Sequence, residues 1–301
     1  MHHRGKVKDE VEMLGKWTKL AATIGVLLLA GCADNQDTDS AASTESNSEP
    51  TELELVQEEG VLTVATSGTL FPSSYHDEET NELTGYETEV LREIADRLGV
   101  EIEFDEMGYD GILTSVLNGT ADVAAGIDIT EDRKETFQFS EPTKYTVGGI
   151  VVRESDDSGI ASLEDVAGKK AGGAATSIWS DMARELGAEV IPYDNATNDI
   201  FFRDIASGRI DIVMHDYFLS ATAVEKFSDL GVKMSEVQYN PTTSAMIFSK
   251  EDTTLVDEVN SIVEELRNEG VLSELSKEFY DGQDISEPMA GFKDLPVIEV
   301  E

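Results

Sequence analysis

The sequence predicts an α/β protein built as two lobes, each organised around a mostly parallel sheet. From Glu52 onward, segments in which apolar residues alternate are followed by segments in which they recur every three or four positions. Many of the segments with helical periodicity end at a glycine, a residue that favours a helix terminus. This order of strand, helix and glycine occurs twice along the chain, which favours two α/β lobes over one.

The first half contains three predicted strands and two predicted helices. In the first helix, Val90, Leu91, Ile94, Ala95 and Leu98 fall on one face, and Gly99 follows directly. The strands are predicted at 61–65, 100–104 and 121–126, and the helices at 87–98 and 112–117.

The second half repeats this pattern, with strands at 170–174, 189–193 and 210–214 and helices at 177–186 and 199–206. A last helix carries Leu255, Val259 and Ile262 on one face, and we expect it to return and cover the first lobe. That return requires two crossings, near 146–152 and 243–248, which together make a hinge of two strands. The predicted lobes are 52–146 with 246–286 and 147–245, followed by a C-terminal tail at 287–301.

The single cysteine, Cys32, indicates how the protein is targeted. It follows the apolar run 21–29, which has the length of a signal-peptide core and is too short to span a bilayer. Lys16 and Lys19 precede this run, and Ala30 and Gly31 stand directly before the cysteine. The segment resembles the lipobox of bacterial lipoproteins, in which the peptide is cut before a cysteine that becomes lipidated. A buried or reactive thiol is the alternative.

Composition excludes several classes of function. Residues 32–51 are polar and acidic without an aromatic, so we expect a flexible tether. The chain carries 62 acidic and 22 basic residues, a formal net charge of −40, which disfavours nucleic acid as a partner. The acids form no pattern like an EF-hand loop and the four histidines have no ligand spacing, so neither metal nor cofactor is expected.

Six motifs occur in order along the folded region, from Thr66-Ser67-Gly68-Thr69-Leu70-Phe71-Pro72 to Gly208-Arg209-Ile210-Asp211 with Asp216. Between them lie Leu83-Thr84-Gly85-Tyr86-Glu87, Tyr109-Asp110-Gly111, Ile129-Thr130-Glu131-Asp132-Arg133 and Phe139-Ser140-Glu141-Pro142. The chain resembles family 3 of the extracellular solute-binding proteins, which serve ABC importers of polar amino acids. The resemblance covers Gly60 to Ser286 and implies a two-lobed periplasmic-binding-protein-like fold of type II.

Two charged residues are expected to hold the ligand's own charges. The resemblance implies that Arg133 pairs with the carboxylate of a bound amino acid, for which a guanidinium offers two parallel donors. Asp216 follows an apolar strand, at the sheet edge where α/β proteins place ligand groups, and is expected to accept the ammonium. The alternatives are a surface arginine paired with Glu131 or Glu135, and an aspartate that caps the next helix.

Further ligand contacts are expected from the second lobe. Thr176 and Ser177 precede a helix whose free N–H groups favour a carboxylate, although a plain helix cap has the same sequence. Together with Ile178 and Trp179, and with Tyr239-Asn240-Pro241, they resemble the cystine-binding branch of Gram-positive bacteria.

Other contacts are implied for the first lobe. Tyr109 is expected to form a wall of the pocket, with a place in the core as the alternative. Leu70, with Phe71 adjacent, stands where many relatives stack an aromatic ring on the ligand.

Asp128 and Gly126 depart from the family pattern, because relatives place a hydroxyl-bearing residue where Asp128 stands, and Gly126 has no hydroxyl. A carboxylate at this position has two possible roles. It gives the ammonium a second anionic partner, or it competes with the substrate for Arg133.

These features favour a monomeric binding protein that captures a polar amino acid, with cystine first, by closure of two lobes. It would pass the ligand to the permease of an ABC importer, anchored through Cys32 on the outer face of a Gram-positive cytoplasmic membrane. The alternatives are an enzyme on the same fold, such as a cyclohexadienyl dehydratase-like lyase, and a ligand sensor. The sequence has no nucleophile elbow, zinc-ligand spacing or phosphate loop, so no catalytic residue is expected.

Cys32→Ser is expected to abolish lipidation and leave the chain unprocessed, because the thiol is the atom that receives the lipid. Metabolic labelling with a fatty acid, followed by fractionation of the membranes, measures this. Stable anchoring of the processed protein needs more than one acyl chain, and the lipidated cysteine is what would carry them. A variant that still carries lipid and stays with the membrane would contradict the lipobox assignment.

Overall fold

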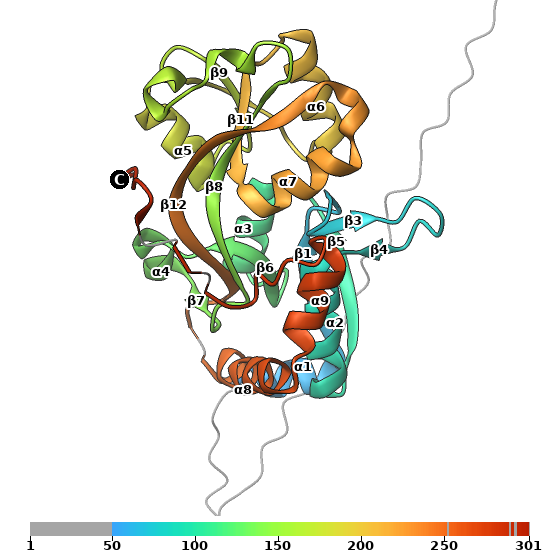
Figure 1. The fold of residues 1–301 in the computed structure, drawn as a ribbon. Helices are drawn as coiled ribbons and strands as arrows, with labels where there is room; N and C mark the ends of the chain where they lie inside the picture. The colour runs from blue at the N-terminus through green and yellow to red at the C-terminus, as the bar shows by residue number, and fades with distance from the viewer. Residues whose placement is uncertain (1–49, 252, 289, 292–293, 301) are drawn as a thin grey trace, which may run out of the picture. The chain divides into compact units, whose positions relative to one another are not determined.

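The computed structural model describes residues 50–251, 253–288, 290–291 and 294–300. Over these residues the chain forms two lobes joined by two long strands (Figure 1). Within the same ranges no helix combines the length and the apolar character needed to cross a membrane. The predicted signal peptide at 1–31, Cys32 and nearly all of the predicted tether lie outside the described residues.

One continuous sheet runs through both lobes, in the order β10 (Glu189–Pro192), β9 (Lys170–Gly173), β11 (Ile212–Asp216), β8, β12, β6 (Val123–Asp128), β1 (Val61–Thr66) and β5 (Glu101–Glu106). The outer strands on each side pair in parallel: β6, β1 and β5 in one lobe, and β10, β9 and β11 in the other. The middle strands β8 (Lys144–Arg153) and β12 (Val232–Phe248) are antiparallel to each other and to their outer neighbours. The predicted two-strand hinge is therefore this antiparallel pair.

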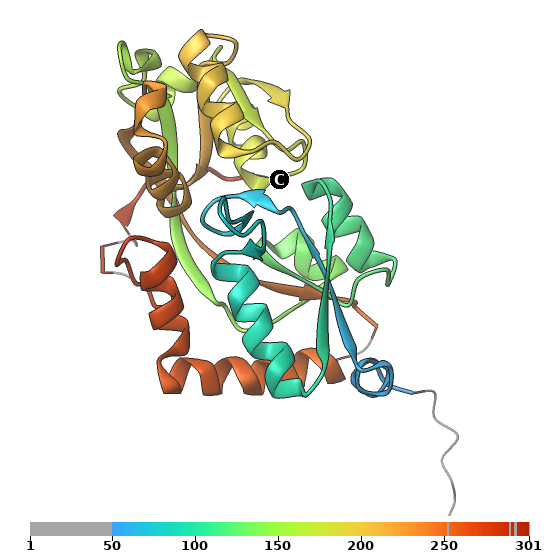
Figure 2. The ribbon, with the colours of Figure 1, turned by 90° about the vertical axis from the view of Figure 1, so that its right-hand side faces the viewer.

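Lobe 1 is built on the parallel strands β1 (Val61–Thr66), β5 (Glu101–Glu106) and β6 (Val123–Asp128). Its helices are α1 (Glu52–Glu59), α2 (Tyr86–Leu98), α3 (Tyr109–Leu117), α4 (Glu131–Thr136), α8 (Thr254–Glu269) and α9 (Val271–Phe279). Leu255, Val259 and Ile262 of α8 share one hydrophobic core with Val64 of β1 and Leu91 of α2. Helix α8, which the sequence predicts as the last helix, therefore packs on the first lobe, and the views agree on this (Figures 1 and 2).

Lobe 2 is built on β9 (Lys170–Gly173), β10 (Glu189–Pro192) and β11 (Ile212–Asp216). Its helices are α5 (Ile178–Glu185), α6 (Asn198–Ser207) and α7 (Tyr217–Lys226), with short 3-10 turns at Asp157–Gly159, Leu163–Val166 and Ser228–Leu230. Two hydrophobic cores hold this lobe: one contains Trp179 and Met182, and the other contains Phe202 and Ile205.

Several elements have no counterpart in the predicted pattern, because they are short or change their surroundings along their length. They are a small antiparallel sheet of β2 (Thr69–Leu70), β3 (Ser74–His76) and β4 (Leu83–Thr84), the two-residue strand β7 (Gln138–Phe139), and helices α1, α4 and α9.

The described part of the C-terminal tail returns to β12. The backbone N–H of Asn240 donates to the carbonyl of Pro296 at 2.8 Å, and the Asn240 amide exchanges hydrogen bonds with the backbone of Ile298 at 2.7 and 3.0 Å. Ile298 is buried in the core that contains Trp179. The tail is thus packed against the second lobe.

Candidate functional site

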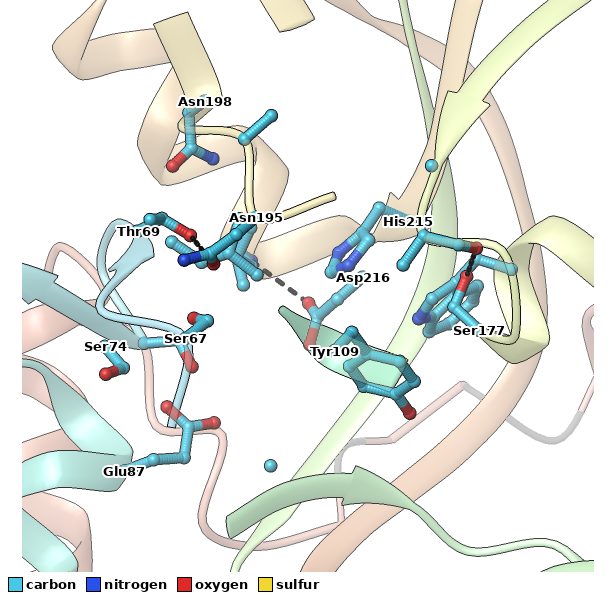
Figure 3. Close-up of a pocket in the computed structure, with 18 of the residues that line it drawn as sticks. Ser67, Thr69, Ser74, Glu87, Tyr109, Ser177, Asn195, Asn198, His215 and Asp216 are labelled. Carbon is cyan, nitrogen blue, oxygen red and sulfur yellow. Dashed lines mark hydrogen bonds between the residues drawn. The ribbon is translucent and has the colours of Figure 1, made fainter. Parts of the chain in front are cut away.

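The main pocket of the described residues lies between the lobes, and both of them line it. Lobe 1 contributes Ser67, Thr69 and Ser74 from the β1–β3 region, Glu87 at the start of α2, and Gly126 and Asp128 at the end of β6. Lobe 2 contributes Ser177 at the start of α5, Asn195 and Asn198 before and within α6, and His215 and Asp216 at the end of β11 (Figure 3). The carboxyl ends of β6 and β11 thus meet at the pocket, as expected for α/β sheets.

Direct hydrogen bonds hold the lobes together at the rim of this pocket. The Thr69 hydroxyl donates to Asn195 Oδ1 at 3.0 Å (Figure 3), and the backbone N–H of Phe71 donates to Asn198 Oδ1 at 3.0 Å. On the α3 side of the pocket, Thr176 donates to the Asp110 carboxylate. The structure is therefore that of a closed form.

Asp216 is buried and serves both the helix and the pocket. Its Oδ1 accepts hydrogen bonds from the backbone N–H of Leu219 at 3.0 Å, as the N-cap of α7, and from the Thr146 hydroxyl at 2.7 Å. Burial opposes the charged form, but Lys144 and these donors hold the pKa of Asp216 below its usual value. The capping role considered from the sequence is real, and the same carboxylate also lines the pocket.

Lys144 and Glu87 form a buried ionic cluster with Asp216 that the sequence did not reveal. The Lys144 Nζ lies 2.9 Å from Glu87 Oε1 and 3.2 Å from Asp216 Oδ2, and all three side chains are at most 6% exposed. Desolvation would lower the pKa of Lys144, but the two carboxylates keep that pKa well above its usual value. Lys144 therefore keeps its charge, and the cluster joins α2 of lobe 1, the hinge strand β8 and β11 of lobe 2.

Asp128 ends β6, buried in the pocket wall. Its carboxylate accepts a hydrogen bond from the Ser244 hydroxyl at 3.0 Å. Burial raises the pKa of Asp128 to about 6, against the opposing influence of Arg133, Lys144 and Ser244. Gly126 lies two residues earlier with a left-handed φ of 72°, and a Cβ there would stand 3.3 Å from Glu87 Oε1. The glycine thus lets the Glu87 side chain lie close to β6.

Arg133 lies in α4 and is not among the residues that line the pocket. Its guanidinium donates to the backbone carbonyl of Asp128 at 2.9 Å and, across the lobes, to that of Thr176 at 3.2 Å. The guanidinium carbon stands 5.8 Å from the centre of the Tyr109 ring, which does line the pocket. Arg133 therefore joins the lobes next to the pocket wall, and its role as the carboxylate partner stays a prediction.

Of the residues at the start of α5, one lines the pocket and the others pack beside it. Ser177 lines the pocket and is the N-cap of α5, accepting from the backbone N–H of Ser180 at 3.2 Å. Thr176 is absent from the lining and contacts Asp110 instead, and Ile178 is buried in the core of lobe 2. Of these three, only Ser177 faces the pocket.

Leu70 lines the pocket and Phe71 does not. The Phe71 ring packs against Tyr75 at 4.8 Å between centroids, and Lys226 Nζ of lobe 2 lies 4.3 Å from its centre. Phe71 thus contributes to contacts between the lobes rather than to the pocket wall.

His215 and Trp179 complete the wall on the side of lobe 2. His215 is partly buried, and desolvation lowers its pKa to about 4, so the imidazole is neutral at physiological pH. The Trp179 ring, 3% exposed, lies 5.8 Å from the His215 ring. Neither His215 nor Glu87 is predicted from the sequence as a site residue, although both line the pocket. Their positions could have indicated this, because His215 directly precedes Asp216 and Glu87 ends one of the six motifs. Within the described residues, no group of three metal-ligating side chains is positioned to hold an ion.

Comparison with known proteins gives a consistent result. The family model of the bacterial extracellular solute-binding proteins, family 3, matches residues 62–166 and 160–282. A probable ABC transporter extracellular-binding protein of Bacillus subtilis, YckB, is 43% identical over 264 residues, 86% of this chain and 89% of the relative. The L-cystine-binding protein TcyA of the same species is 31% identical over 271 residues, 89% of this chain and 97% of the relative.

Solved structures show the same architecture. The crystal structure of YckB matches with a TM-score of 0.65, covering 82% of this chain and 99% of that one. The amino acid ABC transporter substrate-binding protein AbpA of Streptococcus pneumoniae, bound to L-arginine, is 26% identical with a TM-score of 0.70, covering 78% and 100%. The predicted two-lobed fold of type II is confirmed. The family model and the relatives in sequence agree, and the chain belongs to family 3 of the bacterial extracellular solute-binding proteins.

Proposed function

We propose that this protein captures a polar amino acid between its lobes and delivers it to an ABC importer, with cystine as the first candidate. The observation that carries the proposal is the closed pocket, in which a buried acidic cluster from both lobes faces polar groups of α5 and α6. An ammonium buried there gains an anionic partner that offsets its desolvation, which a solute without a charge would not need.

The opposite charge of the ligand has two partners within reach of the same pocket. The N-terminus of α5, with Ser177 in the lining, presents backbone N–H groups and the positive end of the helix dipole. Arg133 adds a guanidinium beside the pocket wall. A zwitterion with its ammonium at Asp216 and its carboxylate toward α5 and Arg133 fits this distribution of charge.

Cystine is favoured because the cystine-binding relative TcyA aligns over nearly its whole length, and because Leu70 rather than an aromatic faces the side-chain space. The arginine-binding extracellular protein ArtP of Bacillus subtilis is 29% identical over 267 residues, so basic amino acids are the next candidates. We further propose a lipid anchor at Cys32 on the outer face of the cytoplasmic membrane, a monomeric state, and a binding rather than catalytic role.

Thermal unfolding of the purified chain in detergent, against the twenty amino acids and cystine, identifies the ligand. At about a thousandfold above its dissociation constant, a ligand that binds only the folded state adds roughly 4 kcal/mol. A shift of several degrees in the unfolding midpoint is then expected for a domain of this size. A shift of the unfolding midpoint with sugars or peptides, and none with an amino acid, would contradict the proposal. A shift with arginine or glutamine alone would exclude cystine as the ligand and leave the rest of the proposal in place.

The pH dependence of binding decides the role of Asp128. Burial raises the pKa of Asp128 to about 6 in this closed form, so its carboxyl loses a proton as the pH rises from 5 to 7. If the carboxylate faces the ligand's ammonium, affinity rises over this range, by at most about tenfold for each unit by which the ligand lowers the pKa.

Calorimetry at pH 5, 6 and 7 measures this dependence, and Asp128→Asn should remove it. We expect affinity to rise with pH, because Arg133 donates to the backbone carbonyl of Asp128 rather than to its carboxylate. The Asp128 carboxylate accepts a hydrogen bond from Ser244 instead. An affinity that falls as the pH increases would show instead that Asp128 competes with the substrate for Arg133.

A further inference from the structure

We propose that Glu87 and Asp216 together hold two cations, of which one is the built-in ammonium of Lys144 and the other is the ammonium of the ligand. This assigns Glu87 as a second ligand-binding carboxylate, contributed by lobe 1, and Lys144 as the residue that limits the subsite to one ligand cation. The inference rests on the proposed function, because it concerns the same pocket.

The first observation is an unsatisfied oxygen. Glu87 is 5% exposed, its Oε1 accepts from Lys144 Nζ at 2.9 Å, and its Oε2 is buried without a hydrogen-bond partner in the described residues. A buried carboxylate oxygen left unpaired is costly, so it needs a partner, and a cationic group of the ligand can supply one in this pocket. Glu87 lines the pocket, and its carboxylate points into the space below Ser67 and beside Ser74 (Figure 3).

The second observation is the charge of the cluster. Lys144 is the single lysine or arginine among the described residues that line the pocket, and it neutralises one of its two carboxylate neighbours. His215, directly next to Asp216, is neutral and supplies no second cation. An ammonium of the ligand beside Glu87 Oε2 and Asp216 would balance the charge of the cluster. The two carboxylates of Glu87 and Asp216 would then alternate with two ammonium groups, one from Lys144 and one from the ligand.

The third observation is that Lys144 is fixed in place. It begins β8, where it pairs in register with Ser244 of β12, so its backbone is held by the hinge sheet. If the Lys144 ammonium moved away, the buried carboxylates of Glu87 and Asp216 would lose their cationic partner and repel each other. A ligand therefore enters beside Lys144 rather than in its place, and a second ligand cation finds that place already filled.

Calorimetry with Glu87→Gln tests the ligand contact. The probe is L-cystine, or L-glutamine if glutamine gives the larger thermal shift, each paired with its analogue lacking amino groups: dithiodipropionic acid or glutaramic acid. We expect Glu87→Gln to weaken binding of the amino acid by about tenfold to a hundredfold, because a charged hydrogen bond is lost. Binding of the analogue should change by less than about threefold, which a misfolded variant would not allow.

Lys144→Met tests the limit of one cation. With the built-in ammonium removed, binding of L-ornithine relative to L-glutamine, which carries a single ammonium, should rise by about tenfold or more, because the second ammonium of ornithine takes the vacated place. The double variant Glu87→Gln with Lys144→Met should lose this gain. Lys233→Met is the matched control, since Lys233 is an exposed lysine of β12 that pairs with Asp157.

The outcomes separate the two claims. A wild-type chain that binds no amino acid overturns the proposed function and this inference together. Wild-type binding that Glu87→Gln leaves within threefold, or weakens equally for the amino acid and its analogue, overturns the inference alone. An unchanged preference in Lys144→Met overturns the account of two cations.

Discussion

The buried ion cluster of Glu87, Lys144 and Asp216 is the interaction on which the site depends. It connects a helix of lobe 1, a hinge strand and a strand end of lobe 2, so the relative position of the lobes and the charge of the pocket are set by the same three side chains. Taking three charges out of water is costly, and the cost is recovered only when their geometry and hydrogen bonds are good. A cluster of this kind is weak evidence for stability and better explained by a function in the cleft.

The fold brings these groups together through the polarity of its sheet. Parallel strands β6 and β11 both end at the cleft, so Asp128 and Asp216 arrive there from different lobes as the last residues of their strands. The antiparallel strands β8 and β12 pass between the lobes and carry Lys144, Thr146 and Ser244 to the same place. The hinge thus supplies side chains to the site as well as joining its halves.

Much of the fold could be predicted because its regular elements have strong periodicity. Strand β1 and helix α2 were expected within one residue of their observed bounds, since each has a clear apolar face. The short strands β2 to β4 have too few residues for a pattern, and β12 changes surroundings over its 17 residues, so its length was not evident. Helix α9 is short and follows α8 after a single glycine.

The site was harder to predict, for a physical reason. Asp216, Tyr109, Ser177 and Leu70 line the pocket and lie in motifs, and Asp128 and Gly126 line it where the chain departs from the family pattern. Arg133, Thr176, Ile178 and Phe71 stand next to the pocket in the same motifs. Neighbouring residues in a loop or helix turn point in different directions, which a motif does not record. Lys144 was missed because a lysine in a sequence is ordinarily a surface residue, and only the structure shows its two carboxylate partners.

Calorimetry of Asp216→Asn against the amino acid identified by thermal unfolding tests the central claim, that the acidic cluster binds the ligand's ammonium. Removing one partner leaves the other ion buried and unpaired, at a cost of about 3–5 kcal/mol. The account predicts a loss of at least about a hundredfold in affinity, with the unliganded protein still folded. Binding within about threefold of the wild-type value would contradict it, because the ammonium would then have to lie elsewhere.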